Sequence, residues 1–586
     1  MIRKICVLFL ALVLSAALAG AEGSEDFLAE LDALTEGDTI SYETRTMTCY
    51  IGNLDSYVDV TLCFFSGEEQ IPFIEAEEMA DLYVTLCRAF GEESAGLYVS
   101  GEDGIARFTR ENGYEMSANY LTGEVSFIDY DAFLQEPGGH ALLDTVGETG
   151  FDSEGLPALF ERVNAQSYDR YGSAVTLNLS GYHIPTVAMD AGWYMPLQTF
   201  SDILVSRKFG MGFLYNGTDL FLANGRQIKN GKELTPLGSL YYKAEPRKRS
   251  AAAAQFNYVE LCFALDLHYG LKESHDIRDF DTVFDDVGFR ELLLDTDPVV
   301  SDCALYNFIE LYLDDLHSTF RCFSWDSGAE PDLEDQELYD GLMSNISARN
   351  MELYEAARSA RYPDGCPVYE EVGNTAYVTF DSFEINNYDY YGETEHDPDA
   401  DTIEMVIYAH RQITREGSPI ENVVLDLSNN DGGTVDAAAY VLCWFLGESS
   451  ISMKDMYTRA VSTATYHADV NLDRVFDERD TVTDKNLFCL ISPNSFSCGN
   501  LLPAAFKADQ SVTLVGRTSG GGSCVVQQLT TAGGAAFQVS GMQRLSIMKN
   551  GSFYDIDAGM DPDVYLRRID TFYDREALTD LLCGLR

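Results

Sequence analysis

The stretch "NLFCLISPNSFSCGNLLPAAFKAD", residues 486–509, decides the fold of the C-terminal half of the chain. It begins as a run of apolar residues, turns between Asn494 and Gly499, and continues with the spacing of a helix. A buried strand that passes through a tight turn into a helix is the repeating unit of an α/β domain. Ser497 stands in this turn, where its hydroxyl could cap the helix or attack a substrate.

Neighbouring segments repeat the alternation of strand and helix. Strands are expected in "TAYVTF" (375–380), "ENVVLDLS" (421–428) and "SVTLVG" (511–516), and helices over 400–415 and 434–446. This pattern predicts an α/β core over residues 331–586. Catalytic and ligand-binding groups are then expected in loops at the carboxyl ends of the strands.

The 586 residues exceed what one ordinary hydrophobic core holds. Residues 22–245 alternate short apolar runs with glycine and asparagine, which predicts a β-rich α+β region whose role the sequence does not indicate. The segments 57–86 and 173–205 share a plan of strand, turn, Pro step and helix, and form a candidate internal repeat. Residues 246–330 show helical periodicity and predict a helical subdomain, with Ser301 or Asp302 expected to cap its last helix.

The charge balance excludes two classes of partner. With 95 Asp and Glu against 39 Lys and Arg, the formal net charge is -56, which disfavours binding to nucleic acid or to an anionic membrane surface. Residues 1–21 have the pattern of a signal peptide cleaved after Ala19 or Ala21, with an uncleaved membrane anchor as the alternative. No later stretch predicts a membrane span. The expectation is a secreted, extracellular bacterial protein.

The sequence predicts no metal site. Its 13 cysteines contain no pair at CxxC spacing, which argues against structural zinc. Cys262, Cys443 and Cys489 lie in apolar runs and are expected to be buried thiols. The acidic stretch "HDPDAD" (396–401) lacks the glycine and the late glutamate of a calcium loop, so a solvated loop is expected there.

Two more motifs carry residues that suit catalysis. In "VVLDLSNNDGG" (423–433), a strand ends in a turn whose N–H groups at Gly432 and Gly433 could bind a phosphate or a reaction oxyanion, or could only shape the turn. In "LYLDDLHSTF" (311–320), His317 follows a predicted helix. A histidine can accept the proton of a serine hydroxyl near neutral pH, although a lone histidine is also common as a structural residue.

Taken in order, five motifs resemble those of the S41 serine peptidases, the family of C-terminal processing and tricorn-core peptidases. They are "LDDLHS" (313–318), "NVVLDLSNNDGG" (422–433), "SFSCGN" (495–500), "LVGRTSGGGSCVVQ" (514–527) and "YDIDAGMDPDVYL" (554–566). The resemblance covers roughly residues 250–586. It implies a ClpP/crotonase-like core, Ser497 as nucleophile, and oxyanion donors at the N–H of Cys498 and in the Gly432–Gly433 turn.

The resemblance also bears on the catalytic base. In the processing-peptidase branch the base is a lysine, but "SGGGSC" (519–524) has Gly522 at that place, and the nearest other lysines are Lys507 and Lys549. The tricorn-like branch uses a histidine instead, and His317 is similar to it, although Leu316 stands where glycine is usual.

The acidic partner of the histidine falls in "YDIDAGMDPD" (554–563), which offers Asp555 and Asp557. The resemblance favours Asp557, which stands just ahead of Gly559 and Pro562. An acid there would orient the imidazole and stabilise its charged form.

The sequence thus predicts a secreted serine-type peptidase that acts on a protein or peptide substrate and requires no metal or organic cofactor. The alternative is an inactive S41-like binding module for peptides, lipids or cell-wall material, which the missing lysine and the loose acid motif also fit. The interval 326–365 is too short for an inserted PDZ module. An oligomeric state is not indicated.

Overall fold

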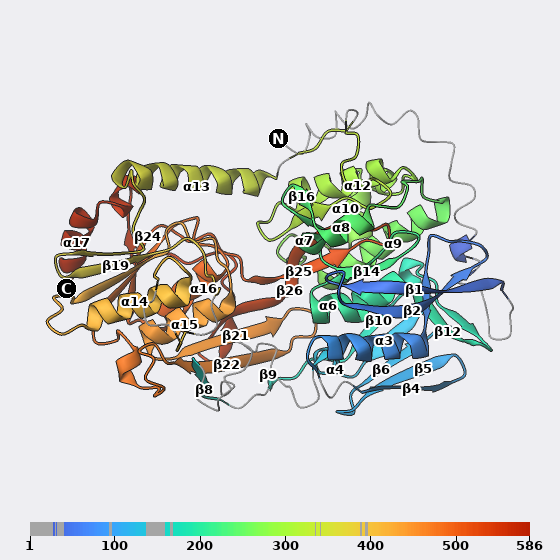
Figure 1. Cartoon of the computed structure of the whole chain (residues 1–586), viewed down its shortest axis with the longest axis horizontal. Coiled ribbons are helices and arrows are strands. Elements are labelled where there is room, and N and C mark those ends of the chain that lie inside the picture. Colours follow the sequence, from blue (N-terminus) through green and yellow to red (C-terminus); the bar gives the residue numbers. More distant parts are fainter. Residues whose placement is uncertain are drawn as a thin grey trace.

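The computed structural model describes residues 27–29, 31, 40–92, 96–135, 159–164, 168–333, 336–339, 341–386, 390–392 and 397–585. The predicted signal peptide, with Ala19 and Ala21, lies outside these residues. Two lobes lie side by side along the longest axis (Figure 1). Long strands, β25 and β26 among them, run between the lobes, and the helix α13 extends from one lobe to the other (Figure 1).

A six-stranded sheet forms the centre of the C-terminal lobe. Its strands, in spatial order, are β18 (Tyr369–Val372), β19 (Thr375–Thr379), β20 (Asn422–Asp426), β23 (Asn486–Ile491), β24 (Val512–Gly516) and β28 (Val564–Tyr565). Only β18 runs antiparallel to its neighbour. The mixed helix and sheet content agrees with the expected α/β character, and the predicted strands at 375–380, 421–428, 486–492 and 511–516 are observed.

Both faces of this sheet are covered, which explains why its strands are apolar throughout. Val423 and Leu425 belong to the core shared with α14 (Thr402–Thr414), α15 (Val435–Leu446) and α16 (Cys498–Asp509). Val424 lies between them in sequence and faces the other core, with α17 (Arg575–Cys583) and Tyr354 of α13 (Leu342–Arg361). The alternation of these neighbours between two cores is the two-residue period of a strand.

A second, eight-stranded sheet links the two halves of the sequence. Its main path is β17 (Thr319–Cys322), β26 (Ala536–Lys549), β21 (Ser449–Asp455), β22 (Val461–Ala468) and β8 (Phe160–Arg162), with β25 (Cys524–Thr530) and β27 (Ser552–Tyr554) on β26 and β9 (Tyr168–Arg170) on β22. The first-half strands β8 and β9 therefore complete a sheet of the second half. The strand β17 begins two residues after His317 and pairs with β26.

The N-terminal lobe contains two further large sheets and a short hairpin of β15 (Lys229–Asn230) and β16 (Glu233–Leu234). The seven-stranded sheet has the order β11 (Val187–Met189), β12 (Gly192–Pro196), β3 (Phe73–Glu75), β2 (Tyr57–Phe65), β1 (Tyr42–Ile51), β14 (Leu220–Ala223) and β13 (Gly212–Tyr215). The five-stranded sheet has the order β10 (Val175–Asn178), β7 (Glu124–Phe127), β6 (Glu115–Asn119), β5 (Ile105–Arg110) and β4 (Leu97–Glu102).

The helices of the N-terminal lobe follow the strands closely. They are α3 (Ala76–Ala89), α4 (Tyr130–Leu134), α5 (Leu197–Phe200), the π-helical turn η4 (Ser201–Val205), α6 (Ser206–Phe209), α7 (Gly225–Ile228) and α8 (Pro236–Tyr241). The two segments of the candidate repeat meet in the seven-stranded sheet, where β3 and β12 pair antiparallel and each leads directly into a helix. The internal repeat itself stays a prediction, as does the four-part division of the chain.

The expected helical segment packs on the N-terminal sheets in one continuous core. It comprises α9 (Ala251–His268), α10 (Phe280–Val287), α11 (Arg290–Leu293), α12 (Pro298–Asn307) and the π-helical turn η5 (Phe308–Leu313). The prediction that Ser301 or Asp302 caps the last helix was wrong, because Asp297 caps α12 through the N–H of Val299. Both residues are instead buried and hydrogen-bonded to Arg249.

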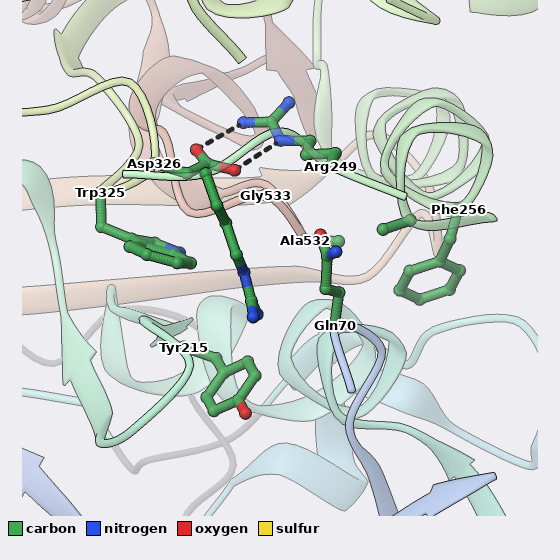
Figure 2. A pocket seen from close by; sticks show the side chains of 10 residues that line it. Gln70, Tyr215, Arg249, Phe256, Trp325, Asp326, Ala532 and Gly533 are labelled. Atoms are coloured by element: carbon green, nitrogen blue, oxygen red, sulfur yellow. Dashed lines mark hydrogen bonds and ion pairs between the residues drawn. The ribbon is translucent and has the colours of Figure 1, made fainter. Parts of the chain in front are cut away.

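Figure 2 shows Arg249 and Asp326 facing one another beside a small cavity, where Arg249 Nε lies 3.0 Å from Asp326 Oδ2. The cavity measures about 20 Å³, room for about one water molecule, and Tyr215 and Trp325 also line it. It lies where the N-terminal sheet, the start of α9 and the end of β17 converge. None of its lining residues belongs to the predicted site.

The helix α13 is a feature that the sequence pattern did not predict. Within its 20 residues only Tyr354 is buried, and the apolar side chains of Leu342, Met343, Ile346, Met351 and Leu353 are exposed. Cys262, Cys443 and Cys489 are buried thiols as predicted, and all twelve cysteines in the described ranges are unpaired.

Among the described residues, no helix combines the length and the hydropathy that crossing a membrane requires. The same residues contain no cluster of three His, Cys, Asp or Glu side chains placed to hold a metal ion.

Arg575 gives the first prediction, because it connects α17 to the sheet through buried charges. Its side chain is 2% exposed, with Nη2 2.8 Å from Asp426 Oδ2 and Nε 3.0 Å from Glu370 Oε1. Arg575→Met leaves the Asp426 carboxylate buried without a cation, which should lower the free energy of unfolding by about 3–5 kcal/mol. Urea denaturation measures the change.

The exposed ion pair of Arg568 with Asp570 provides the control, since exposed pairs add little stability. Equal losses for Arg575→Met and Arg568→Met would contradict this account of the buried pair.

Candidate active site

Ser497 joins β23 to α16 in a strained backbone conformation. Its φ of 56° and ψ of -122° lie in a region that residues with a side chain rarely adopt. The residue occupies the N-cap position of α16, yet its side chain accepts no capping hydrogen bond. Such strain costs on the order of 1–3 kcal/mol and is concentrated at functional sites. Capping does not account for this serine.

The turn of Ser497 packs directly on the turn that follows β20. A Cβ atom added to Gly432 would lie 2.6 Å from Ser497 Cβ and 3.2 Å from the nitrogen of Cys498. One added to Gly499 would lie 2.5 Å from the carbonyl oxygen of Asn430. Contacts below 3.0 Å are essentially never made by real Cβ atoms, so both positions require glycine. The two turns, one from each motif, form a single structure.

Polar side chains fasten these turns together, and sequence reasoning did not single them out. Ser495 Oγ donates to the carbonyl of Leu427 at 2.6 Å, and Ser492 Oγ donates to the carbonyl of Ser428 at 2.5 Å. The backbone N–H of Phe496 donates to the carbonyl of Asn430 at 3.0 Å. The feature of the sequence that could have identified these residues is the run of small polar residues directly after each buried strand.

The structure distinguishes the two predicted glycine donors. The N–H of Gly432 donates to Asn430 Oδ1 at 3.0 Å and is therefore occupied. Within the described ranges, the N–H groups of Gly433 and Cys498 donate no hydrogen bond. Cys498 is the first residue of α16, where backbone N–H groups lack a partner inside the helix. Gly433 and Cys498 thus supply the two open donors beside Ser497.

His317 lies in the turn after η5 and is 7% exposed. Its backbone is fixed at both ends, because its N–H donates to Asp315 Oδ1 at 2.9 Å and its carbonyl accepts from Gln538 Nε2 at 2.7 Å. The imidazole lies 4.7 Å, centroid to centroid, from the ring of Phe496. The structure therefore brings His317 beside the residue that precedes Ser497, although no hydrogen bond joins its ring to Ser497 Oγ in the described residues.

The electrostatic environment of His317 has two opposing parts. Burial lowers the pKa of the imidazole below its ordinary value, while the carboxylates of Asp315 and Asp557 act to raise that pKa. The net direction is downward, so the neutral form that can accept a proton is favoured. The Nδ1 atom is buried and has no hydrogen-bond partner.

The two candidate acids have different surroundings. Asp555 forms an ion pair with Arg544. Asp557 makes no ion pair in the described ranges, and its Oδ1 accepts from the N–H of Ser523 at 3.0 Å and from Ser523 Oγ at 3.1 Å. Because Asp557 also acts on the pKa of His317, it is the better placed of the two predicted acids.

The lysines that the sequence left as other candidate bases are bound elsewhere. Lys507 Nζ lies 2.8 Å from Asp563 Oδ1 and 2.8 Å from the carbonyl oxygen of Asp561. Lys549 Nζ lies over the ring of Tyr554, 4.6 Å from its centroid. Neither side chain is directed to Ser497 by these contacts, so His317 is the one of the three predicted candidate bases that lies near the serine.

Residues 374–566 match the model of peptidase family S41. This region contains β19 to β28, Ser497, the Gly432–Gly433 turn and Asp557. Over these residues the chain is similar to the S41 serine peptidases. His317 and the N-terminal lobe lie outside the matched residues.

Solved structures that match the chain include the photosystem II D1 C-terminal processing protease, at 17% identity over 35% of this chain and 47% of that chain, with a TM-score of 0.26. A lipoprotein from Streptococcus agalactiae matches at 14% identity over 58% of this chain and 98% of that chain, with a TM-score of 0.34. Mature CPAF complexed with lactacystin matches at 12% identity over 57% and 98% of the two chains, with a TM-score of 0.37.

The chain covers less than half of the processing protease, and all three TM-scores lie below 0.5. No curated protein matches the chain. The functional conclusion therefore depends on the family match and on the geometry of the site.

The backbone strain at Ser497 makes a direct prediction. Glycine adopts positive φ without cost, whereas alanine keeps the strain, so Ser497→Gly should be more stable than Ser497→Ala by about 1 kcal/mol. Ser344 in the helix α13 is the matched control, because there glycine should be less stable than alanine by about 1 kcal/mol. Chemical denaturation of the four variants tests this reversal. Glycine less stable than alanine at both sites would show that Ser497 is unstrained.

Proposed function

We propose that this chain is a serine-type peptidase that hydrolyses peptide bonds through an acyl-enzyme on Ser497, on a ClpP/crotonase-like core. One observation carries the proposal: a serine held at positive φ, free of any capping bond, beside the open N–H groups of Cys498 and Gly433. A serine in a strained turn between strand and helix has its hydroxyl exposed, and the N–H that follows it is suited to bind an oxyanion.

The proposed mechanism uses His317 as base. The imidazole takes the proton of Ser497 Oγ, the oxygen attacks the peptide carbonyl, and the proton passes to the leaving amine. The oxyanion accepts hydrogen bonds from the N–H groups of Cys498 and Gly433. Loss of one such donor typically costs about a hundredfold to a thousandfold in rate. Water then attacks the acyl-enzyme and releases the second product.

Asp557 is the proposed third member of the site. Its negative charge stabilises the imidazolium that forms when His317 accepts the proton. The two hydrogen bonds from Ser523 hold the carboxylate in place and leave its second oxygen outside these contacts. The oxygen that Ser523 leaves open is suited to the buried Nδ1 of His317, which has no other partner.

The proposed substrate is a protein or peptide outside the cell, in line with the signal peptide predicted at residues 1–21. The strongly acidic composition favours a substrate that is not itself strongly acidic, since like charges repel.

The alternative is an inactive binding module on the same fold. It is favoured by Gly522 at the expected lysine place and by the lack of a hydrogen bond between His317 and Ser497 in the described residues. Hydrogen bonds of this kind are often long before substrate binds, so the second observation is also compatible with an enzyme.

Covalent labelling with a fluorophosphonate probe separates the two functions. The full chain should be labelled, and both Ser497→Ala and His317→Ala should abolish labelling, because the first removes the nucleophile and the second its base. Ser511→Ala and His467→Ala are the matched controls and should label like the unaltered chain. Absence of labelling, or labelling that survives Ser497→Ala, would support the binding module. Loss with Ser497→Ala alone would point to another base.

The pH dependence of labelling gives a further prediction. A base must be neutral to accept a proton, so the rate should rise with pH through the pKa of His317 and then level off. Burial lowers this pKa, which should place the midpoint of the rise below about 6.5, the ordinary value for histidine. Labelling rates across the acidic and neutral range measure the midpoint. A midpoint clearly above that value would contradict His317 as a buried base.

A further inference from the structure

The ring of Phe496 lies close to both His317 and Gly522. Its centroid is 4.7 Å from that of the imidazole, with the two rings inclined at 50°. A Cβ atom added to Gly522 would lie 2.3 Å from Cε2 and 2.4 Å from Cζ of the same ring. The Phe496 ring therefore contacts the histidine and occupies the space next to the place where a lysine side chain was expected.

The backbone around Phe496 leaves its ring little freedom. Its own N–H donates to the carbonyl of Asn430 at 3.0 Å, and Phe496 forms an isolated parallel bridge with Gly521. In that bridge the N–H of Ser497 donates to the carbonyl of Gly521 at 2.9 Å. The direction in which the ring leaves the main chain is thus set by the same turn that holds the serine.

The glycine at 522 is required by this ring. Its φ of +80° already disfavours any residue with a side chain, and even a methyl group would overlap the Phe496 ring. The ring and a lysine side chain at 522 therefore exclude each other. In the structure the Nδ1 atom of His317 has no hydrogen-bond partner, so the ring contact with Phe496 helps to fix the imidazole.

We propose that Phe496 is a positioning residue for His317: its ring holds the imidazole beside the turn of Ser497 and shields it from water. Because Gly522 has no side chain, it leaves the space that the Phe496 ring occupies. This inference rests on the proposed function for its catalytic consequence.

Two carboxylates act electrostatically on the same imidazole and must be kept unchanged in any test. Asp315 lies on the turn of His317 and Asp557 lies near the end of the chain, and both act to raise the pKa of His317. Replacing Phe496 by a smaller residue leaves both charges in place and admits water. Better hydration of the charged form then moves the pKa of His317 upward, towards its ordinary value.

The test compares Phe496→Leu with Phe209→Leu in the full chain. Phe209 is also half-buried and its ring lies 5.0 Å from that of Phe90, but it is in α6 of the N-terminal lobe. Phe496→Leu should slow fluorophosphonate labelling by about tenfold to a hundredfold, the usual effect of a misplaced catalytic group, and should move the pH midpoint of labelling upward. Phe209→Leu should change neither. A slower rate with an unmoved midpoint would overturn the inference, as would an unchanged rate.

A second measurement does not depend on activity. The imidazole of His317 can be titrated by NMR with ¹³C-labelled histidine, and its signal is identified as the one of the 8 histidines that His317→Ala removes. Phe496→Leu should move this titration to higher pH whether or not the chain labels. A titration that stays in place would overturn the inference. If instead the titration moves and the unaltered chain is not labelled, the proposed function fails while the contact stands.

Gly522→Ala provides an independent variant of the same contact. The added methyl group should displace the Phe496 ring and shift the His317 titration in the same direction as Phe496→Leu. Because both changes act through one ring, their effects should not add in the double variant. Additive effects would show that Gly522 and Phe496 act separately and would overturn their proposed coupling.

Discussion

The close approach of Gly432 to Ser497 is the constraint on which the site depends. With only 2.6 Å available for a Cβ atom, the turn after β20 can approach the turn after β23 only if residue 432 is glycine. The approach turns the N–H of Gly432 towards Asn430 and leaves the N–H of Gly433 open next to that of Cys498. Ser497, the residue approached, is at positive φ. Two loops at adjacent strand ends thereby form one structure that brings Ser497 next to two open N–H groups.

The proposed base reaches this site from a different part of the chain. His317 precedes β17, whose pairing with β26 carries it from the helical segment to the C-terminal lobe, and Gln538 of β26 binds its carbonyl. The N-terminal lobe shares one core with that helical segment and adds β8 and β9 to the eight-stranded sheet. The position of the histidine consequently depends on the packing of both lobes, which gives residues outside the S41 match a structural part in the site.

Much of this could be predicted from the sequence, for definite physical reasons. The doubly covered strands are apolar throughout, so β19, β20, β23 and β24 were predictable, and the turns that follow them drew attention to Ser497 and Gly433. The backbone dihedral of Ser497 is not encoded in any local pattern, so capping and attack could not be distinguished. Which of the two glycine N–H groups is occupied depends on the Asn430 side chain, which binds that of Gly432, and α13 buries only Tyr354. The contact of Phe496 with His317 joins residues distant in sequence.

The most direct test of the central claim is a crystal structure of the chain after reaction with a fluorophosphonate. The account predicts a phosphorus–oxygen bond to Ser497 Oγ, with a phosphonyl oxygen within hydrogen-bonding distance of the N–H groups of Cys498 and Gly433. An adduct on another residue, or one on Ser497 whose phosphonyl oxygen points away from both N–H groups, would contradict it.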